Sequence, residues 1–275
     1  QGPGKAMAPF QATHADLSVE AFAADGFDLV HQLAVYLAIS PEELTQRLPQ
    51  STADLANLHP GAFDWTAAER FYEDEVGQGH LLELAAWHLG SAGYIADTLR
   101  LQQRFARGAV LDFGGGIGTH ALAAAALADV EQVWFVDLNP HNRAFVASRA
   151  RTLGLADRLH CARDLSDPAL PDRFDTIVCL DVLEHLPDPA AQLEIFATRM
   201  QPEAVALLNW YFFQGFAGEY PFHLDDPRLV ETFFRTLQGR FLEVFHPYLI
   251  TTRAYRLARC CVSPRSSAEQ LDEPL

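Results

Sequence analysis

Positive charge is scarce in this 275-residue chain, which has 20 Lys and Arg residues against 36 Asp and Glu residues. The formal net charge of −16 at pH 7 would repel a phosphate backbone, and no basic stripe runs along the sequence. We therefore expect no nucleic-acid partner. Net charge is an average, so this argument concerns extended nucleic-acid surfaces and not a single local patch.

Cysteine is also sparse. The chain has four cysteines, namely Cys161, Cys179, Cys260 and Cys261. They form no Cys-x-x-Cys pair and no Cys/His ligand spacing, which argues against a disulfide framework and a zinc site. Reduced thiols in a cytoplasmic protein are the simplest interpretation. His80 and His88 lack an obvious third ligand, so we predict no metal.

Long apolar runs are missing as well. No stretch of roughly 18 apolar residues exists, so the sequence predicts no membrane span. No short apolar core follows a basic start, so no signal peptide is expected. Residues 1–6 look like a cloning remnant ahead of a native Met7, and residues 263–275 form a polar C-terminal tail. Apolar residues nevertheless make up 49% of the chain, enough for a sizeable core.

Residues 7–106 are predicted to form a helical cap. The segment 27–37 has apolar residues at three-to-four spacing, which is typical of an amphipathic helix. Ser40-Pro-Glu-Glu combines an N-cap residue, a first-turn proline and two acids, and so begins another helix. Asp64 is expected to cap a third helix. A longer helical stretch over 79–104 contains a glycine-rich break.

Residues 107–262 show apolar strands that alternate with helices. The predicted strands cover 109–113, 132–136, 158–162, 174–180, 204–212, 241–245 and 249–258. The predicted helices between them cover 119–127, 140–153, 189–200 and 227–237. Strands separated by helices of this length indicate an α/β fold with a doubly wound, mostly parallel sheet.

The first of these strands runs into a glycine turn, Asp112-Phe-Gly114-Gly-Gly116-Ile-Gly118, which a helix leaves. Glycine permits positive φ and a close approach of a ligand to the backbone, and the helix N-terminus supplies free N–H groups. Asp112 precedes the first glycine, where it would repel a pyrophosphate. We therefore favour a ligand that carries an ammonium group; a plain tight turn is the alternative.

Acidic residues follow the next two strands. Asp137 ends the second strand and can accept two ribose hydroxyl bonds. Its alternative role is a helix N-cap, but Asn139 is the better candidate for that cap, which leaves Asp137 free, and Leu138 would pack on an adenine face. Asp164 follows the third strand and can accept an adenine amino group, while the N–H of Leu165 meets a ring nitrogen. The alternative is an exposed loop acid.

The fourth strand ends beside the glycine turn, where its last residues face the reactive part of a bound cofactor. The order and spacing of all these motifs resemble the class I S-adenosylmethionine-dependent methyltransferases, in the small-molecule branch with the ubiquinone and menaquinone enzymes. The resemblance covers about residues 107–258 and rests on Asp112-x-Gly114-x-Gly116-x-Gly118, Asp137, Asp164-Leu165 and Asp181-Val-Leu-Glu184-His185.

This resemblance implies a Rossmann-like, seven-stranded sheet with an antiparallel last strand. It also implies S-adenosylmethionine as cofactor, a small-molecule substrate as methyl acceptor and release of S-adenosylhomocysteine. Gly114 and Gly116 would approach the methionine moiety, Asp137 would bind the ribose, and Asp164 and Leu165 would frame the adenine.

Candidates for the chemistry lie after the fourth and fifth strands. Methyl transfer depends mainly on positioning, and a general base is needed only for a protonated acceptor. His185 is the first candidate for that base, because histidine titrates near neutrality; a structural histidine is the alternative. Glu184 orients His185 or caps the local turn. Tyr211, Trp210 and His223 are possible acceptor contacts, with sheet packing or a surface position as alternatives.

Aromatic and histidine side chains of the helical cap are expected to cover the cofactor mouth; these are Tyr72, His80, Trp87, His88 and Tyr94. Related enzymes place a residue at the spacing of Tyr94 on the methionine carboxylate, although helix packing would also explain it. A cap of this kind would exclude water and define the acceptor.

Three other functions stay open at this point. The same cofactor can be consumed without an external acceptor, when its own amine attacks and methylthioadenosine is released. A binding-only module would keep the cofactor site without turnover, although the presence of Asp112, Asp137 and Asp164 argues against it. An NAD-dependent dehydrogenase is the third. The acceptor, the atom methylated and the oligomeric state do not follow from the sequence.

Overall fold

The computed structural model describes residues 16–51, 64–248 and 251–258. The predicted cloning remnant 1–6, the polar tail 263–275, Cys260 and Cys261 lie outside the described residues. The strands form one seven-stranded sheet in the order β3-β2-β1-β4-β5-β7-β6. Their bounds are β1 Gly108–Phe113, β2 Val130–Val136, β3 Leu159–Ala162, β4 Phe174–Cys179, β5 Met200–Leu208, β6 Phe241–Val244 and β7 Arg253–Leu257.

Strands β1 to β5 pair in parallel, whereas β7 runs antiparallel to both β5 and β6. The predicted mostly parallel sheet and its antiparallel last strand are therefore confirmed. Because strand order reverses between β1 and β4, the carboxyl ends of these two strands flank the point at which an open α/β sheet binds ligands.

The expected end of the fifth strand is wrong. β5 stops at Leu208, where the ladder ends on both sides, because β4 has its last paired residue at Cys179 and β7 its first at Arg253. Residues 209–213 therefore follow the sheet without strand pairing. The alternation of side chains between the two faces of a strand therefore does not decide the orientation of Tyr211.

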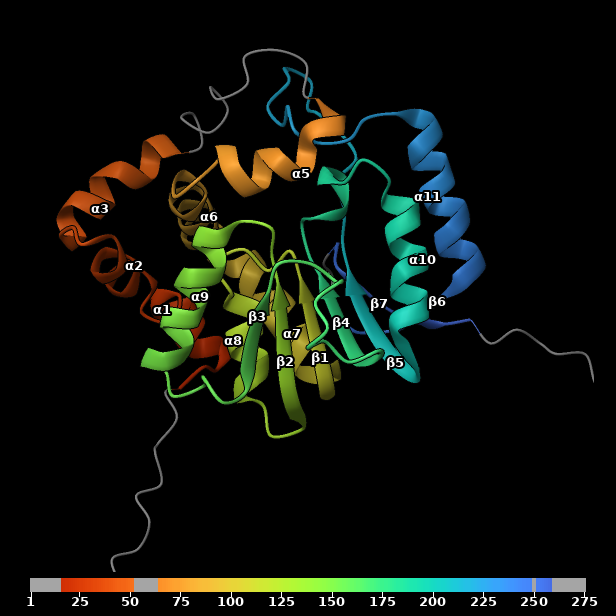
Figure 1. Cartoon of the computed structure of the whole chain (residues 1–275), viewed down its shortest axis with the longest axis horizontal. Coiled ribbons are helices and arrows are strands. Elements are labelled where there is room, and N and C mark those ends of the chain that lie inside the picture. Colours follow the sequence, from red (N-terminus) through yellow and green to blue (C-terminus); the bar gives the residue numbers. More distant parts are fainter. Residues whose placement is uncertain (1–15, 52–63, 249–250, 259–275) are drawn as a thin grey trace, which may run out of the picture.

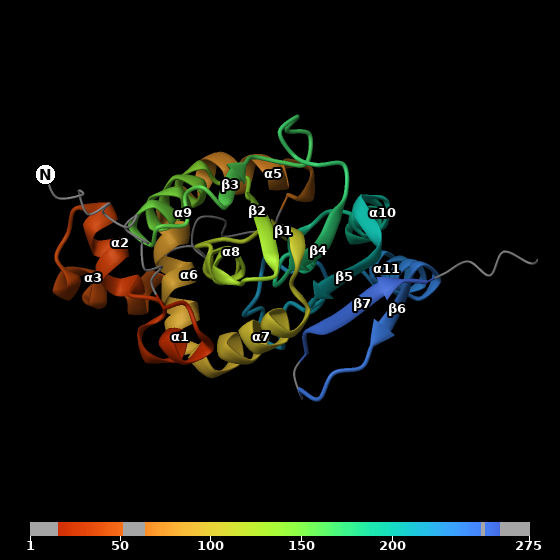
Figure 2. The same ribbon diagram turned by 90° about the horizontal axis from the view of Figure 1, so that it is seen from below.

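Helices cover both faces of the sheet (Figure 2). On one face lie α7 (Ala92–Phe105), α8 (Thr119–Ala126) and α9 (Pro140–Thr152), whose apolar side chains share a core with β1 and β2. On the other lie α10 (Pro189–Arg199) and α11 (Pro227–Arg240), which pack against β4, β5 and β7. No helix in the described part of the chain has the length and apolar character needed to cross a bilayer.

The helical cap wraps round one side of the sheet and over its ligand-binding edge (Figure 1). Its elements are α1 Val19–Asp25, α2 Leu29–Leu37, α3 Pro41–Arg47, η1 Leu48–Gln50, η2 Trp65–Ala67, α5 Ala68–Arg70, the π-helix η3 Phe71–Glu75 and α6 Gly79–Gly90. Ser40 accepts a bond from the N–H of Glu43 at 3.1 Å, as its sequence predicts. Ser91 separates α6 from α7, at the expected break.

A buried arginine joins this cap to the sheet domain. Arg149 of α9 is 1% exposed, and its guanidinium donates to Gln32 and to the carbonyl oxygens of Gly26, Phe27 and Ile117. A buried charge with this many partners is satisfied, and removing them would leave it unpaired. The first helices of the cap are therefore held firmly against α9 and the glycine turn.

Candidate active site

The glycine turn after β1 has the backbone that its sequence predicts. Gly114, Gly116 and Gly118 have φ values of 70°, 57° and 77°, a region that glycine adopts without strain. Gly115 is required for a different reason, since a Cβ there would lie 2.4 Å from Oδ2 of Asp112. The turn delivers the chain to the N-terminus of α8 and leaves room for Asp112 beneath it.

Asp112 is an ionisable group held inside the protein beside this turn. It is 3% exposed, and its Oδ2 has no hydrogen-bond partner among the described residues. Burial, followed by repulsion from Asp137, raises the pKa of its carboxyl group to about 7. An unpartnered buried acceptor of this kind fits a cationic ligand group, which supports the sequence argument for an ammonium.

Asp137 at the end of β2 is bound to the turn itself. Its Oδ2 accepts the N–H of Gly116 at 3.0 Å, and its Oδ1 accepts the N–H of Asn139 at 2.9 Å and the amide of Asn142 at 3.2 Å. Asn139 does act as the N-cap of α9, by accepting from His141 at 2.8 Å. Asp137 is thus relieved of the capping role, as expected, but backbone N–H groups bond to its carboxylate from both sides.

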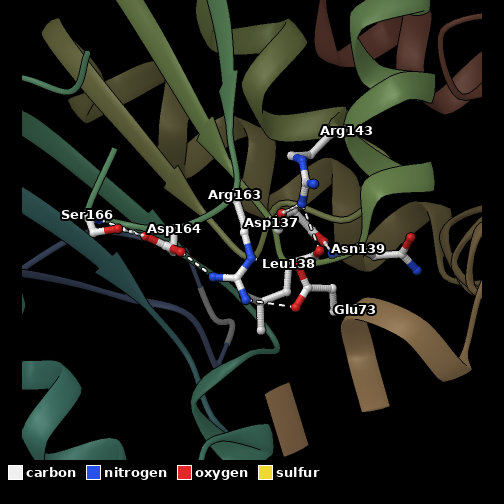
Figure 3. Close-up of polar contacts among 8 residues, drawn as sticks. All are labelled: Glu73, Asp137, Leu138, Asn139, Arg143, Arg163, Asp164 and Ser166. Carbon is white, nitrogen blue, oxygen red and sulfur yellow. Dashed lines mark hydrogen bonds and ion pairs between the residues drawn. The ribbon is translucent and has the colours of Figure 1, made fainter. Parts of the chain in front are cut away.

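Asp137 keeps capacity for a ligand in spite of these bonds. A carboxylate offers about four acceptor sites, of which the three donors occupy only a part. Burial raises the pKa of Asp137 to about 6, against the hydrogen bonds and the nearby Arg143, which act in the opposite direction. Arg143 also donates to the carbonyl oxygens of Asp137 and Leu138 at 2.6 and 2.7 Å, which fixes the backbone that carries Leu138 (Figure 3).

The segment after β3 is joined to the helical cap by an ion pair. Arg163 donates from Nε and Nη2 to the two carboxylate oxygens of Glu73 in η3, at 2.6 and 2.7 Å, and also pairs with Asp164 (Figure 3). Asp164 accepts the N–H of Ser166 at 2.8 Å. This bond closes the kind of turn that is expected of an acidic residue in an exposed loop. Leu165 packs against the core, and its carbonyl accepts from Arg199.

Glu73 was not found by sequence reasoning. It carries no motif of its own, and the only available signal was an arginine directly before the predicted adenine-binding acid. The contact places η3 over the ends of β2 and β3, where the sequence predicts the adenosine site.

Asp181 after β4 is held in an uncommon conformation by Asn209. Its φ is 55°, which is rare for a residue other than glycine. Asn209, which is 2% exposed, accepts the N–H of Asp181, and its amide donates to the Asp181 carboxylate at 3.0 Å and to Oη of Tyr94 at 2.7 Å. The helical cap thus brings Tyr94 to the ends of β4 and β5. Burial raises the pKa of Asp181 to about 6.

The two candidate histidines lie against each other. The ring centroids of His185, in the 3-10 helix η4 (Leu183–His185), and His223 are 4.8 Å apart. Nδ1 of His185 lies 3.0 Å from Oη of Tyr72 and 3.2 Å from the carbonyl oxygen of Phe222. Burial and the nearby His223 lower the pKa of His185 to about 3, so its imidazole is neutral.

Tyr211 and Trp210 differ in position although they are adjacent in sequence. Tyr211 is 49% exposed and packs against Tyr220 and His223. Trp210 instead packs against Phe233 of α11, as the packing alternative has it, and its contact with an acceptor stays a prediction. The orientation of a side chain that follows the end of a strand depends on the helix that packs there, and the sequence pattern does not reveal this packing.

The helical cap reaches the glycine turn directly. A Cβ at Gly116 would lie 2.8 Å from Cδ1 of Leu84 in α6, so this helix packs on the turn. Other cap residues have structural contacts: His88 bonds to Thr119 at 3.0 Å, and His80 to Asn142 at 3.2 Å. Helix α6 therefore lies over the glycine turn, where the sequence predicts the cofactor mouth.

The sheet order, the glycine turn after β1 and the acids after β2, β3 and β4 define a Rossmann-like fold. Residues 86–219 match the family model described as a methyltransferase domain. The match covers just under half of the chain, and the resemblance to the class I S-adenosylmethionine-dependent methyltransferases is confirmed.

Two curated relatives show how far the sequence similarity extends. An uncharacterised protein from Synechococcus is 35% identical over 121 residues, which are 43% of this chain and 28% of that protein. The ubiquinone biosynthesis O-methyltransferase of Xanthomonas campestris is 32% identical over 165 residues, 58% of this chain and 64% of that enzyme. The chain therefore spans less than two thirds of the length of these relatives.

Among solved structures, the mitomycin 7-O-methyltransferase MmcR has a similar fold. The TM-score is 0.51 at 17% sequence identity, and the match covers 78% of this chain and 67% of that one. At this level of identity the likeness concerns the fold alone.

Proposed function

We propose that the protein transfers the methyl group of S-adenosylmethionine to an oxygen atom of a small-molecule acceptor. The observation that carries the cofactor assignment is the unpartnered, buried Oδ2 of Asp112 beneath a glycine turn that Asp137 also contacts. The choice of oxygen is supported by the curated O-methyltransferase relatives. The acidic surface, with its net charge of −16, favours a small metabolite over a nucleic acid.

The cofactor would lie across the ends of β1 to β4. Asp112 and the turn Gly114–Gly118 would hold the amino-acid moiety, with Tyr94 and Asp181 at its other side. Asp137 would accept the ribose hydroxyls. Leu138 and Leu165 would enclose the adenine, with Asp164 at its edge and the Glu73–Arg163 pair closing this end.

When bound, S-adenosylmethionine supplies a methyl group that is already activated by the sulfonium, so the protein contributes mainly position and exclusion of water. His185, Tyr211 and His223 are proposed to face the acceptor from the ends of β4 and β5. His185 as general base stays a prediction. A pKa of about 3 makes it a poor proton acceptor at neutral pH, so the acceptor hydroxyl would need help to ionise.

The test is an analysis of products. The protein is incubated with S-adenosylmethionine and a panel of phenols, catechols and aliphatic alcohols, and the mixture is examined by mass spectrometry. We expect S-adenosylhomocysteine and a methylated acceptor in equal amounts, and neither with Asp137→Ala at the same cofactor concentration. Methylthioadenosine without a methylated acceptor, or cofactor binding without any product across the panel, would contradict the proposal.

A further inference from the structure

The helical cap carries a partly buried carboxylate, Glu83, that the fold itself does not use. Glu83 lies in α6, the helix whose Leu84 packs on Gly116 of the glycine turn. Within the described part of the chain, its carboxylate makes no hydrogen bond and no ion pair. Burying a carboxylate without such a partner costs stability, so the position of Glu83 is more easily explained by a ligand than by folding.

The face of α6 that carries Glu83 is directed at the ligand-binding edge of the sheet. Residues three and four apart share a helix face, so Glu83 lies between His80 and Trp87. His80 bonds to Asn142 of α9 at 3.2 Å, beside the end of β2. The ring of Trp87 packs against Tyr94, whose hydroxyl group reaches the ends of β4 and β5. The buried apolar side chains of α6 instead enter the core shared with α2 and α9.

The surroundings of Tyr72 place Glu83 on the acceptor side of this edge. Burial, followed by the carboxylates of Glu83 and then Glu184, raises the pKa of the Tyr72 hydroxyl group well above its usual range. The same hydroxyl group lies 3.0 Å from Nδ1 of His185. A carboxylate acts on a hydroxyl group in this way only from nearby. Glu83, Tyr72 and His185 therefore belong to one neighbourhood, to which α6, η3 and η4 each contribute a side chain.

The other ionisable groups of this neighbourhood are poor proton acceptors. Burial lowers the pKa of both His185 and His223, so their imidazoles take up a proton weakly near neutral pH. Glu184 is 1% exposed, and its Oε2 is sealed from solvent. The carboxylate of Asp181 accepts from the amide of Asn209 at 3.0 Å. Glu83 differs from both acids, because it is neither sealed nor hydrogen-bonded within the described residues.

We propose that Glu83 is the general base that takes the proton from the hydroxyl group of the methyl acceptor. This role rests on the proposed function. As the acceptor oxygen forms its bond to the methyl carbon, its O–H bond breaks and the proton passes to a carboxylate oxygen of Glu83. The electron pair of the methyl–sulfur bond returns to sulfur. The proton then leaves Glu83 for solvent, which reaches its partly buried side chain.

The acidity of Glu83 suits this role. Burial raises the pKa of its carboxyl group to about 7, which keeps it largely ionised at neutral pH and makes it a stronger base than an exposed carboxylate. The ionisable groups around it are Tyr72 on η3, Glu184 and His185 on η4, and His80 on its own helix. Methyl transfer should therefore be fastest above about pH 8 and slow down as the pH falls through about 7.

The test compares wild type and Glu83→Gln as they methylate phenol and the more acidic 4-nitrophenol, with S-adenosylhomocysteine release as the readout. We expect Glu83→Gln to lower kcat at least about 100-fold for phenol but less than about tenfold for 4-nitrophenol, which ionises with little help. Glu83→Asp, which keeps the carboxylate, should recover part of the loss. The matched control is Glu69→Gln, an exposed carboxylate in α5 of the same cap, which should leave kcat unchanged.

A second readout needs no turnover. In infrared difference spectra between pH 8 and pH 5, the wild type should gain a protonated-carboxyl band near pH 7 that Glu83→Gln lacks and Glu69→Gln keeps. S-adenosylhomocysteine affinity and melting temperature should stay within a few-fold and a few degrees of wild type in both.

Three results overturn the inference alone: wild-type kcat for phenol in Glu83→Gln, an equal loss for phenol and 4-nitrophenol, or a Glu83 that stays ionised at pH 5. An equal loss would assign Glu83 to positioning and not to proton transfer. A wild type that binds S-adenosylmethionine but methylates no acceptor would overturn the proposed function, and the role of Glu83 as base with it.

Discussion

The ligand-binding edge of the sheet has two halves that are built differently. At the ends of β1 to β3, the groups that face the site are backbone N–H groups of a glycine turn and carboxylates such as Asp112 and Asp137. At the ends of β4 and β5, imidazoles and phenols, represented by His185, His223 and Tyr211, join the carboxylates of Asp181 and Glu184. The first half suits the recognition of one fixed cofactor, and the second suits the chemistry of an acceptor.

The halves also differ in how far along the chain their parts come from. Asp112 and Gly116 belong to one short turn, and Asp137 directly follows the adjacent strand. In the acceptor half, Tyr72 reaches His185 from 113 residues away, and His223 arrives on a long loop. The cofactor half is therefore built mainly from residues that are close in sequence, whereas the acceptor half depends on tertiary packing.

The largest effect is expected when the glycine turn is filled. In Gly115→Ala the new Cβ would lie 2.4 Å from Oδ2 of Asp112 and 2.6 Å from the ring of Phe135. We expect a loss of about 1–3 kcal/mol of stability by overpacking and roughly 100-fold weaker S-adenosylhomocysteine binding, because Asp112 is displaced. Thermal melts and calorimetry measure both effects.

Gly93→Ala is the matched control for that variant. Gly93 lies in α7, and its added Cβ would meet nothing within 4 Å, so the change should be neutral or stabilising. If Gly115→Ala and Gly93→Ala bound S-adenosylhomocysteine with equal affinity, the glycine turn would not be the part of the edge that recognises the cofactor.

A smaller effect is expected from pH. The pKa of Asp137 is raised to about 6, and the charged groups that face it are Asp112 on β1 and Arg143 on α9. Its ribose bonds need the ionised carboxylate, so cofactor affinity should be full near pH 8 and fall about tenfold by pH 5. For folding the sign is opposite. Because the pKa in the folded protein exceeds the ordinary aspartate value of 3.8, this group's stabilising contribution is complete below pH 3.8 and is lost as the pH rises through about 6.

Calorimetry with S-adenosylhomocysteine between pH 5 and 8 checks this prediction. Asp137→Asn should bind weakly at every pH and lose the steep part of the profile. A wild-type affinity that is constant between pH 5 and 8 would show that Asp137 does not bind the ribose as a carboxylate.

The smallest effect is expected at the contact between the helical cap and the adenine end. The side chains of Arg163 and Glu73 are 43% and 27% exposed, and exposed pairs contribute about 0–1 kcal/mol. Arg163→Ala should therefore weaken cofactor binding by at most about fivefold, and mainly by faster release. Arg235→Ala, which removes a remote pair with Glu231 on α11, is the control. A tenfold loss in stopped-flow release experiments would mean that Arg163 contacts the cofactor itself.

Much of the fold could be predicted from local signals. Ser40 and Asn139 could be predicted as N-caps because capping is a local interaction. Each side chain accepts a bond from an N–H group two or three residues further along the chain. The strands that lead to the glycine turn and to Asp137 are short apolar runs bounded by helices. The end of β5 could not be predicted, since it depends on where β4 and β7 stop, and the apolar sequence through Phe212 continues past that point.

The acceptor half shows what local signals omit. His185 and His223 were each named as candidates, but nothing in their spacing indicates that their rings meet or that Glu184 joins them with an unpartnered oxygen. The prediction of no metal considered the cysteines and the pair His80 and His88, which share a helix. Similarly, the bond from the N–H of Gly116 to Asp137 joins the turn after β1 to the end of β2, and no local pattern indicates it.

The central claim is that the ends of β1 to β3 recognise S-adenosylmethionine. The most direct test is a calorimetric titration of wild type and Asp137→Ala with S-adenosylmethionine, and separately with NAD. The account predicts one S-adenosylmethionine site per wild-type chain, binding more than about tenfold weaker in Asp137→Ala, and no NAD binding. NAD binding in place of S-adenosylmethionine, or equal S-adenosylmethionine affinity in the two proteins, would contradict it.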